Sequence, residues 1–173
     1  AGHDPDDASS ARIAVPDYLA GLEMGVAGLR VGLPVSYFRD SLSPEVEQRF
    51  EDAIAVFKAA GAVIVDIPMP ASIRFTNSLT SLIIATEGAA LHQKWLQTRA
   101  NDYCRQTIGR LAGGLLTPAT RYLQALDLRR TLLAEFAELV FRRVDILLTP
   151  MLPMPVPTIV ATDVGVRPEA AEV

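Results

Sequence analysis

Residues 29–70 have the pattern of a complete strand, helix and second strand, and this unit constrains the fold more than any other stretch of the chain. The first strand is predicted at Arg30–Pro34, a short apolar run closed by a proline that cannot donate to a central hydrogen-bond ladder. The second is predicted at Ala62–Ile67, a β-branched run typical of a strand buried on both faces. Two strands joined by a helix are expected to lie parallel with a right-handed crossover.

The helix between these strands carries its start and stop signals in the sequence. Ser43 suits the N-cap, Pro44 suits the first helical position, and Gly61 suits the left-handed conformation that ends many helices. Apolar residues recur at helical spacing: Val46, Phe50, Ala53, Ile54, Phe57 and Ala60. One face of this helix is therefore apolar, and charged residues largely occupy the other.

Further helices and a third strand are predicted after this unit. One helix is expected from about Asn77 to Thr98, and a shorter one over Asp102–Leu111 is expected to be broken by Gly113-Gly114. The pair Thr117-Pro118 repeats the cap-and-proline start, and the long apolar stripe after it reaches Arg143. A third strand is predicted over residues 145–150. These elements indicate an α/β fold in layers, with a central mostly parallel or mixed sheet flanked by helices.

Length and composition limit the function classes. A chain of 173 residues predicts one domain or a part of one, and the net charge of -4 gives no electrostatic footprint for nucleic acid or an anionic membrane. No apolar run approaches the roughly 20 residues of a membrane helix. The single cysteine, Cys104, excludes an internal disulfide framework and suits a reducing compartment, so a cytoplasmic location is expected.

Two features indicate a part of a larger fold. Half of the residues are hydrophobic, more than a free-standing domain of this size would easily hide from water. The chain also opens with Ala1 and a polar segment that resembles the interior of a longer protein. Residues 158–173 are expected to form a proline-containing tail that either crosses a surface in extended form or is disordered.

Several candidate sites favour an ordinary structural interpretation. His3 and the aspartates that follow it are expected to form a solvated loop with turn and cap residues, because metal ligands usually converge from separate elements. No metal site is therefore predicted. Glu87 and His92 lie in one predicted helix but are five residues apart, so they do not share a face. A surface acid and an amphipathic histidine are favoured over catalysis.

Five segments, taken in order, resemble the later part of an amidase signature family enzyme. They are Gly2-His3-Asp4-Pro5-Asp6-Asp7, Gly28-Leu29-Arg30-Val31-Gly32-Leu33-Pro34, Gly61-Ala62-Val63-Ile64-Val65, Tyr122-Leu123-Gln124-Ala125 with Arg129 and Arg130, and Asp145-Ile146-Leu147-Leu148-Thr149-Pro150. Each segment alone is weak, but five in this order with similar gaps are much more specific. Residues 1–157 are therefore expected to be the later portion of an amidase signature domain, and the α/β fold an incomplete part of that family's fold.

The resemblance implies a chemistry. Members of the family cleave or transfer from a carboxamide C–N bond with a serine nucleophile, a second serine and a lysine, through an acyl-enzyme and without a cofactor. A buried lysine made neutral by desolvation takes the proton through the bridging serine, and backbone N–H groups stabilise the oxyanion. The expected small-molecule partner is an amide, and which amide stays open.

The catalytic residues are expected to lie outside this chain. In the family, the lysine and the glycine- and serine-rich nucleophile segment precede the stretch that residues 2–7 resemble. The two lysines present, Lys58 and Lys94, lie outside any such signature. The chain by itself is therefore predicted to hydrolyse no amide, and the N-terminal portion of the same fold is expected to be its partner.

By its position in the family pattern, the chain is expected to contribute walls of a substrate pocket. Tyr122, Arg129 and Thr149 are the candidate substrate-binding residues, with Arg110 as a weaker one. The alternatives stay open: Tyr122 as an anchor of the long helix, Arg129 as a solvated or ion-paired residue, and Thr149-Pro150 as a strand end.

Two other functions stay open at this level. The chain could be a non-catalytic α/β interaction module, or a degenerate amidase relative, that binds a partner chain through exposed apolar surface. A phospho-relay receiver fits the alternating elements but is poorly supported, because Asp66 is the only acidic residue near a strand end. Association into homo-oligomers is also left open by the apolar composition.

Overall fold

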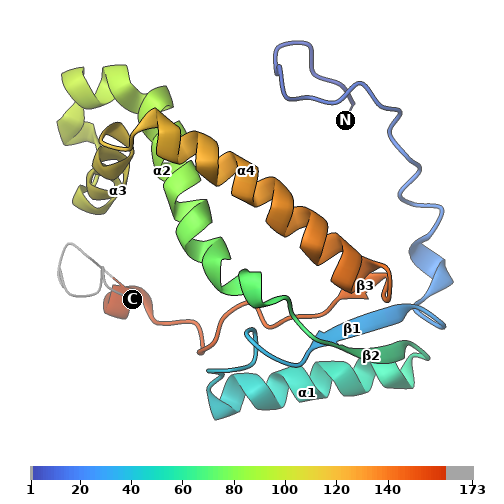
Figure 1. Cartoon of the computed structure of the whole chain (residues 1–173). Coiled ribbons are helices and arrows are strands. Elements are labelled where there is room, and N and C mark those ends of the chain that lie inside the picture. The colour runs from blue at the N-terminus through green and yellow to red at the C-terminus, as the bar shows by residue number, and fades with distance from the viewer. Residues whose placement is uncertain (1, 163–173) are drawn as a thin grey trace.

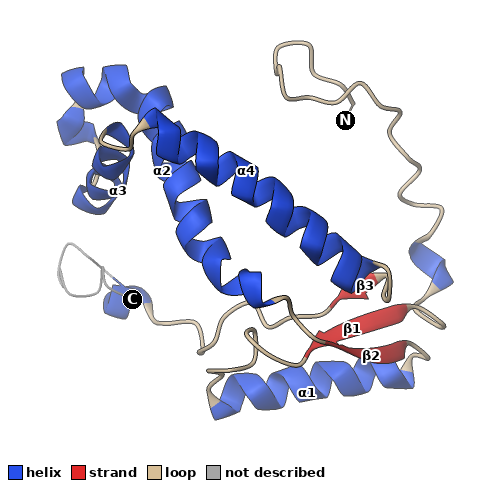
Figure 2. Ribbon diagram, viewed as in Figure 1, coloured by secondary structure: helices blue, strands red, loops and turns tan. Residues whose placement is uncertain are grey.

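The computed structural model describes residues 2–162, which form a small α/β layer and a long helical arm (Figures 1 and 2). The α/β layer contains the three strands and α1 (Pro44–Ala59). The arm consists of α2 (Thr76–Thr98), which leads away from the sheet, α3 (Arg105–Leu115) at the far end, and α4 (Ala119–Phe136), which returns to it. The predicted α/β class is confirmed.

The sheet has three parallel strands in the order β2-β1-β3. The central strand is β1 (Arg30–Pro34), flanked by β2 (Val63–Ile67) and the short β3 (Ile146–Leu147). Val31 lies opposite Ile64 on one side and Ile146 on the other. The predicted parallel pairing of the first two strands is confirmed, whereas the third strand is shorter than the predicted residues 145–150.

Two apolar clusters hold the layers together. Leu33, Phe50 and Ile54 join β1 to α1. Ile67, Val140 and Val144 pack β2 against the segment that follows α4. At the start of α1, the Ser43 hydroxyl accepts a hydrogen bond from the Val46 N–H at 3.3 Å, as its predicted N-cap role requires.

The expectation that the second strand is buried on both faces is wrong. Val63 and Asp66 in β2 are exposed, and only Ile67 is fully buried. Within the described residues β2 is an edge strand, and the two apolar clusters cover its faces only in part, since Ile64 packs against one cluster and Val65 against the other and both are half-buried. The β-branched run therefore predicted a strand correctly, but it did not predict how far that strand is buried.

The helical arm corrects a second expectation. A helix was predicted to break at Gly113-Gly114, but α3 runs through both residues to Leu115. A Cβ built on Gly114 would overlap the carbonyl oxygen of Ala85 in α2. Gly114 therefore allows two helices to approach closely instead of ending one.

The other helices agree closely with the sequence prediction. The helix predicted over residues 77–98 is α2, preceded by the 3-10 turn η2 (Ala71–Phe75). The long helix predicted to reach Arg143 divides into α4 and a π-helical segment, η4 (Ala137–Phe141). Another 3-10 turn, η3 (Ala100–Asp102), connects α2 to α3.

The ends of the described chain are mainly irregular. The opening loop contains the predicted turns: Asp4 accepts the Asp6 N–H at 2.9 Å and Asp7 accepts the Ser9 N–H at 2.8 Å. A 3-10 turn, η1 (Leu22–Met24), precedes β1, and a short helix, α5 (Ile159–Thr162), ends the described part. The predicted tail thus begins with one helical turn, and its residues 163–173 lie outside the described residues. Among the described helices, none has both the length and the apolar character needed to cross a membrane.

Candidate functional site

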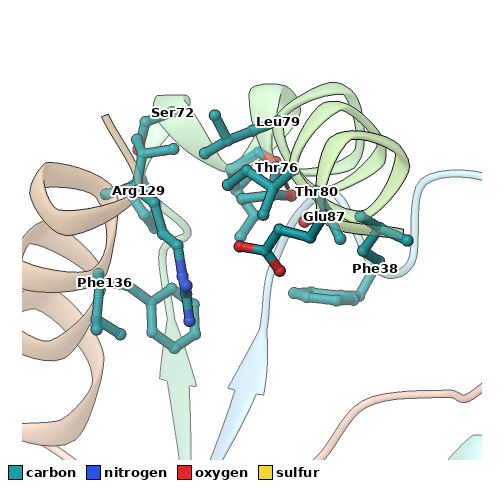
Figure 3. Close-up of a pocket in the computed structure, with 14 residues that line it drawn as sticks. Phe38, Ser72, Thr76, Leu79, Thr80, Glu87, Arg129 and Phe136 are labelled. Carbon is teal, nitrogen blue, oxygen red and sulfur yellow. Dashed lines mark hydrogen bonds between the residues drawn. The ribbon is translucent and has the colours of Figure 1, made fainter. Parts of the chain in front are cut away.

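A cavity of about 640 Å³ lies between α2 and α4, at the end of the arm that is next to the sheet (Figure 3). Phe38, which follows β1, and Pro70, which follows β2, form its border with the sheet. The rest of the lining comes from η2, α2 and α4. The cavity therefore lies beyond the carboxyl ends of two parallel strands, the edge at which α/β proteins commonly bind ligands.

Apolar side chains make up most of the cavity wall. They are Phe38, Pro70, Ile73, Leu79, Ile83, Ile84, Leu132, Leu133 and Phe136. The polar lining consists of the hydroxyls of Ser72, Thr76 and Thr80 and the charged groups of Glu87 and Arg129. Mostly apolar walls with a few polar groups are typical of sites for small organic molecules.

A hydrogen bond between α4 and α2 fixes one charged group of the cavity. The Tyr122 hydroxyl donates to Oε1 of Glu87 at 2.8 Å. This hydrogen bond to the carboxylate is the main cause that raises the pKa of Tyr122 above its ordinary value of 10, while the positive charge of Arg129 acts in the opposite direction. Tyr122 is therefore held as a neutral donor that orients Glu87.

A second hydrogen bond joins α4 to η2, closer to the sheet. The Ser72 hydroxyl, in η2, donates to Glu135 of α4. With the Tyr122–Glu87 pair, it ties α4 to η2 and α2 at two separate points along the cavity. Figure 3 shows Glu87 and Arg129 among the side chains that line the cavity, from the two different helices.

Comparison with known proteins identifies the family. A family model described as Amidase matches residues 1–170. The chain belongs to the amidase signature family. The predicted resemblance is thereby confirmed.

Two curated relatives show how much of a family member this chain represents. It is 36% identical over 155 residues to an amidase from Pseudomonas putida, a match that covers 90% of this chain and 33% of that protein. It is 33% identical over 177 residues to a glutamyl-tRNA(Gln) amidotransferase subunit from Trichlorobacter lovleyi, covering 90% of this chain and 36% of the relative. The chain thus spans about a third of the length of these relatives.

A solved structure gives the same relationship in three dimensions. It is described as a vestigial protein complex that reveals the evolutionary origins of an s-triazine catabolic enzyme. The chain matches it with a TM-score of 0.78 and 29% identity, over 91% of this chain and 33% of that one. The described fold therefore corresponds to about a third of a larger chain.

Within this member of the amidase signature family, the four candidate substrate-binding residues lie in different places. Arg129 lines the cavity, and the half-buried Tyr122 reaches it through Glu87. Thr149 follows β3 and is partly buried, but it is not among the lining residues. Arg110 is exposed on α3, also outside the lining. A substrate-binding role for each of the four residues stays a prediction.

Glu87 is the cavity residue that sequence reasoning set aside. It was interpreted as a surface acid, and it is indeed exposed, but it lines the cavity and accepts a hydrogen bond from Tyr122 of α4. His92, five residues later, makes a separate contact with the Tyr103 hydroxyl at 2.8 Å. The prediction that Glu87 and His92 do not act together agrees with these different partners. No sequence signal links Glu87 to Tyr122, because they belong to separate helices.

The described residues offer little else that is typical of catalysis. Lys58 and Lys94 are both exposed and outside the cavity lining, unlike the desolvated lysine that the family chemistry requires. Among residues 2–162, no group of three His, Cys, Asp or Glu side chains is arranged to hold a metal ion. The cavity can therefore contribute shape, apolar contact and a few hydrogen bonds.

Proposed function

We propose that this chain is part of an enzyme that hydrolyses, or transfers from, a carboxamide C–N bond through a serine acyl-enzyme, with the catalytic residues outside the chain. The observation that carries the proposal is the family match over residues 1–170. Relatives of both kinds, an amidase and an amidotransferase component, align over 90% of the chain, which supports amide chemistry in either form.

In this enzyme, the cavity between α2 and α4 forms part of the substrate pocket. Its place beyond the strand ends and its volume of about 640 Å³ support this role. Arg129 would contact the substrate directly, and Tyr122 would act as a positioning residue by orienting Glu87. Thr149 and Arg110 are kept as weaker pocket candidates, since both lie outside the lining of this cavity.

The chain would pack against the N-terminal portion of the same fold. Large apolar side chains such as Met151, Leu116 and Leu91 are mainly exposed, which supports burial against further protein. The same surface would also serve a non-catalytic module that binds a partner chain, or a homo-oligomer. A cytoplasmic location is proposed as well, since the only cysteine, Cys104, is a free thiol.

A hybrid enzyme tests the proposal. The part of the Pseudomonas putida amidase that aligns with this chain is replaced by residues 1–170, and ammonia release is measured with a series of primary amides. We expect turnover by the hybrid, and none by the 173-residue chain alone or by a hybrid whose nucleophilic serine is changed to alanine. A hybrid that unfolds cooperatively on heating but releases ammonia from no amide would contradict the enzymatic role and favour the binding module.

A further inference from the structure

Tyr37, which follows the central strand, has a backbone conformation that an aromatic residue rarely adopts. Its φ is 68°, and it is the only residue other than glycine with a positive φ in the described part of the chain. The Phe38 N–H donates to the Ser36 carbonyl at 2.9 Å, which closes a γ-turn centred on Tyr37. Such a turn is strained for a residue with a side chain, whereas glycine would form it without strain. The strain indicates that the tyrosine side chain itself is needed at this position.

Contacts inside this chain fix the turn on both sides. Before the turn, the Val35 N–H donates to the Ile67 carbonyl at 3.1 Å. After the turn, Arg39 forms an ion pair with Glu51 of α1 and lies over the Phe50 ring, 5.3 Å from its centroid. The α/β layer therefore holds the strained conformation without any contact to the remaining part of the fold.

The Tyr37 side chain lines a second cavity, of about 390 Å³, between the loop after β1 and η2. Pro70 and Ile73 line this cavity and also the larger one, which Phe38 lines (Figure 3). The turn thus lies between two neighbouring cavities. Both are beyond the carboxyl end of the central strand, at the edge where α/β proteins commonly bind ligands.

The hydroxyl of Tyr37 is available to a ligand. In the part of the chain that the structure describes, it forms no hydrogen bond with another residue, and its side chain is half-buried in the cavity wall. The other half-buried tyrosine hydroxyls are engaged, that of Tyr122 by Glu87 and that of Tyr103 by His92. Tyr37 therefore combines a strained backbone with a phenol that has a hydrogen bond to offer.

We propose that the Tyr37 hydroxyl donates a hydrogen bond to an oxygen of the amide substrate. This role rests on the proposed function. The competing interpretation is that the hydroxyl meets the N-terminal portion of the fold. The substrate is favoured because strained residues that their own surroundings hold in place are typical of active sites and ligand clamps, whereas packing between two parts of a fold needs no strained backbone.

A pair of tyrosine variants of the hybrid amidase tests the role. Its kcat/KM is measured with acetamide, butanamide and benzamide, together with the thermal midpoint of unfolding. Tyr37→Phe is expected to lower kcat/KM about fivefold, the effect of one lost neutral hydrogen bond, and to leave the thermal midpoint unchanged. Tyr103→Phe removes the contact with His92, so it is expected to lower the thermal midpoint and leave kcat/KM unchanged.

Two results would overturn the proposal. One is an equal effect of Tyr37→Phe and Tyr103→Phe on kcat/KM. The other is a lower thermal midpoint for Tyr37→Phe with unchanged kcat/KM, which would assign the hydroxyl to a contact with the rest of the fold.

Two further variants of the hybrid test the strained turn. Tyr37→Gly and Tyr37→Ala both remove the ring, but only glycine adopts a φ of 68° without strain. We expect a higher urea midpoint for Tyr37→Gly than for Tyr37→Ala, and a lower kcat/KM for both than for the unchanged hybrid. Equal urea midpoints would show that the turn is not strained and would remove the basis of the proposal.

The same hybrid separates the role of Tyr37 from the proposed function. Turnover that Tyr37→Phe leaves unchanged would overturn the role of Tyr37 and leave the amidase function intact. A hybrid that unfolds cooperatively on heating but turns over no amide would overturn the amidase function, and the role of Tyr37 with it.

Discussion

Arg30 and Asp145, which are 115 residues apart in the sequence, are joined by hydrogen bonds in both directions. Nη2 of Arg30 donates to Oδ1 of Asp145 at 2.6 Å, and the Arg30 backbone N–H donates to Oδ2 at 2.9 Å. The Asp145 backbone N–H donates in return to the Arg30 carbonyl at 2.9 Å. The hydrogen bonds from Arg30 lower the pKa of Asp145 to about 2. This pair therefore fixes the start of β3 beside the start of β1.

The pair predicts an acid-dependent loss of stability. Because the folded state lowers the pKa of Asp145 below its ordinary value near 4, its contribution to stability is present above about pH 4 and is lost as the pH falls towards 2. Asp145→Asn should lower the urea midpoint at pH 7, and the difference from the wild type should close between about pH 4 and pH 2. The difference in urea midpoint between the wild type and Asp145→Asn should also shrink at high salt, since both side chains of the pair are partly exposed.

A matched control for this pair lies on α1. Asp52 forms an exposed ion pair with Arg49 one turn away, so Asp52→Asn should change the urea midpoint little at any pH. A difference between wild type and Asp145→Asn that stays constant from pH 7 to pH 2 would show that the carboxylate charge is not the cause.

Replacing each of two adjacent glycines of α3 by alanine should affect the free energy of unfolding differently. Gly114→Ala would force a methyl group into the Ala85 carbonyl, so we expect a loss of about 2 kcal/mol or more in the free energy of unfolding. Gly113 has open space around its missing side chain, so Gly113→Ala should be neutral or stabilising by about 0.5 kcal/mol through helix propensity. Chemical denaturation of both variants measures this, and similar values would disprove the close contact of α2 with α3.

The N-cap of α1 gives a third prediction. Ser43→Ala removes the hydrogen bond to the Val46 N–H, and we expect it to cost about 1 kcal/mol of unfolding free energy. Ser41, two residues earlier, is exposed and outside the helix, so Ser41→Ala should leave stability nearly unchanged. Equal urea midpoints for the two variants would mean that the cap contributes nothing.

Tyr122 should titrate at unusually high pH. Its hydrogen bond to Glu87 favours the neutral phenol, so its pKa is raised above 10, and the stability it contributes is present below pH 10 and lost at higher pH. The ultraviolet absorbance of tyrosinate reports this titration. Tyr122→Phe should remove the component with the raised pKa, and Glu87→Gln should move that component to lower pH. Tyr18→Phe, at an exposed position, is the control that should leave this component in place.

The candidate residues include only part of the cavity lining. Arg129 was proposed from its place in the family pattern, and it lines the cavity, whereas Arg110 and Thr149 were proposed in the same way and lie outside the lining. Glu87 was visible only as one acid on a predicted helix. Its partner Tyr122 is 35 residues away on another helix, and sequence periodicity describes a face of one helix, not the helix that it meets.

The sequence by itself determined the local elements of this protein. The cap at Ser43, the proline after it and the apolar spacing up to Gly61 defined α1, because capping and helical periodicity depend on residues three or four positions apart. The ordered family segments determined the membership that the family match confirms.

Tertiary structure alone decided the environment of these elements. It made β2 an edge strand, used Gly114 for a helix contact, and opened a cavity between α2 and α4. These features depend on distances between segments that are dozens of residues apart. A local pattern of hydrophobicity specifies that a side chain should be buried, but which neighbour buries it is set only when the whole chain packs.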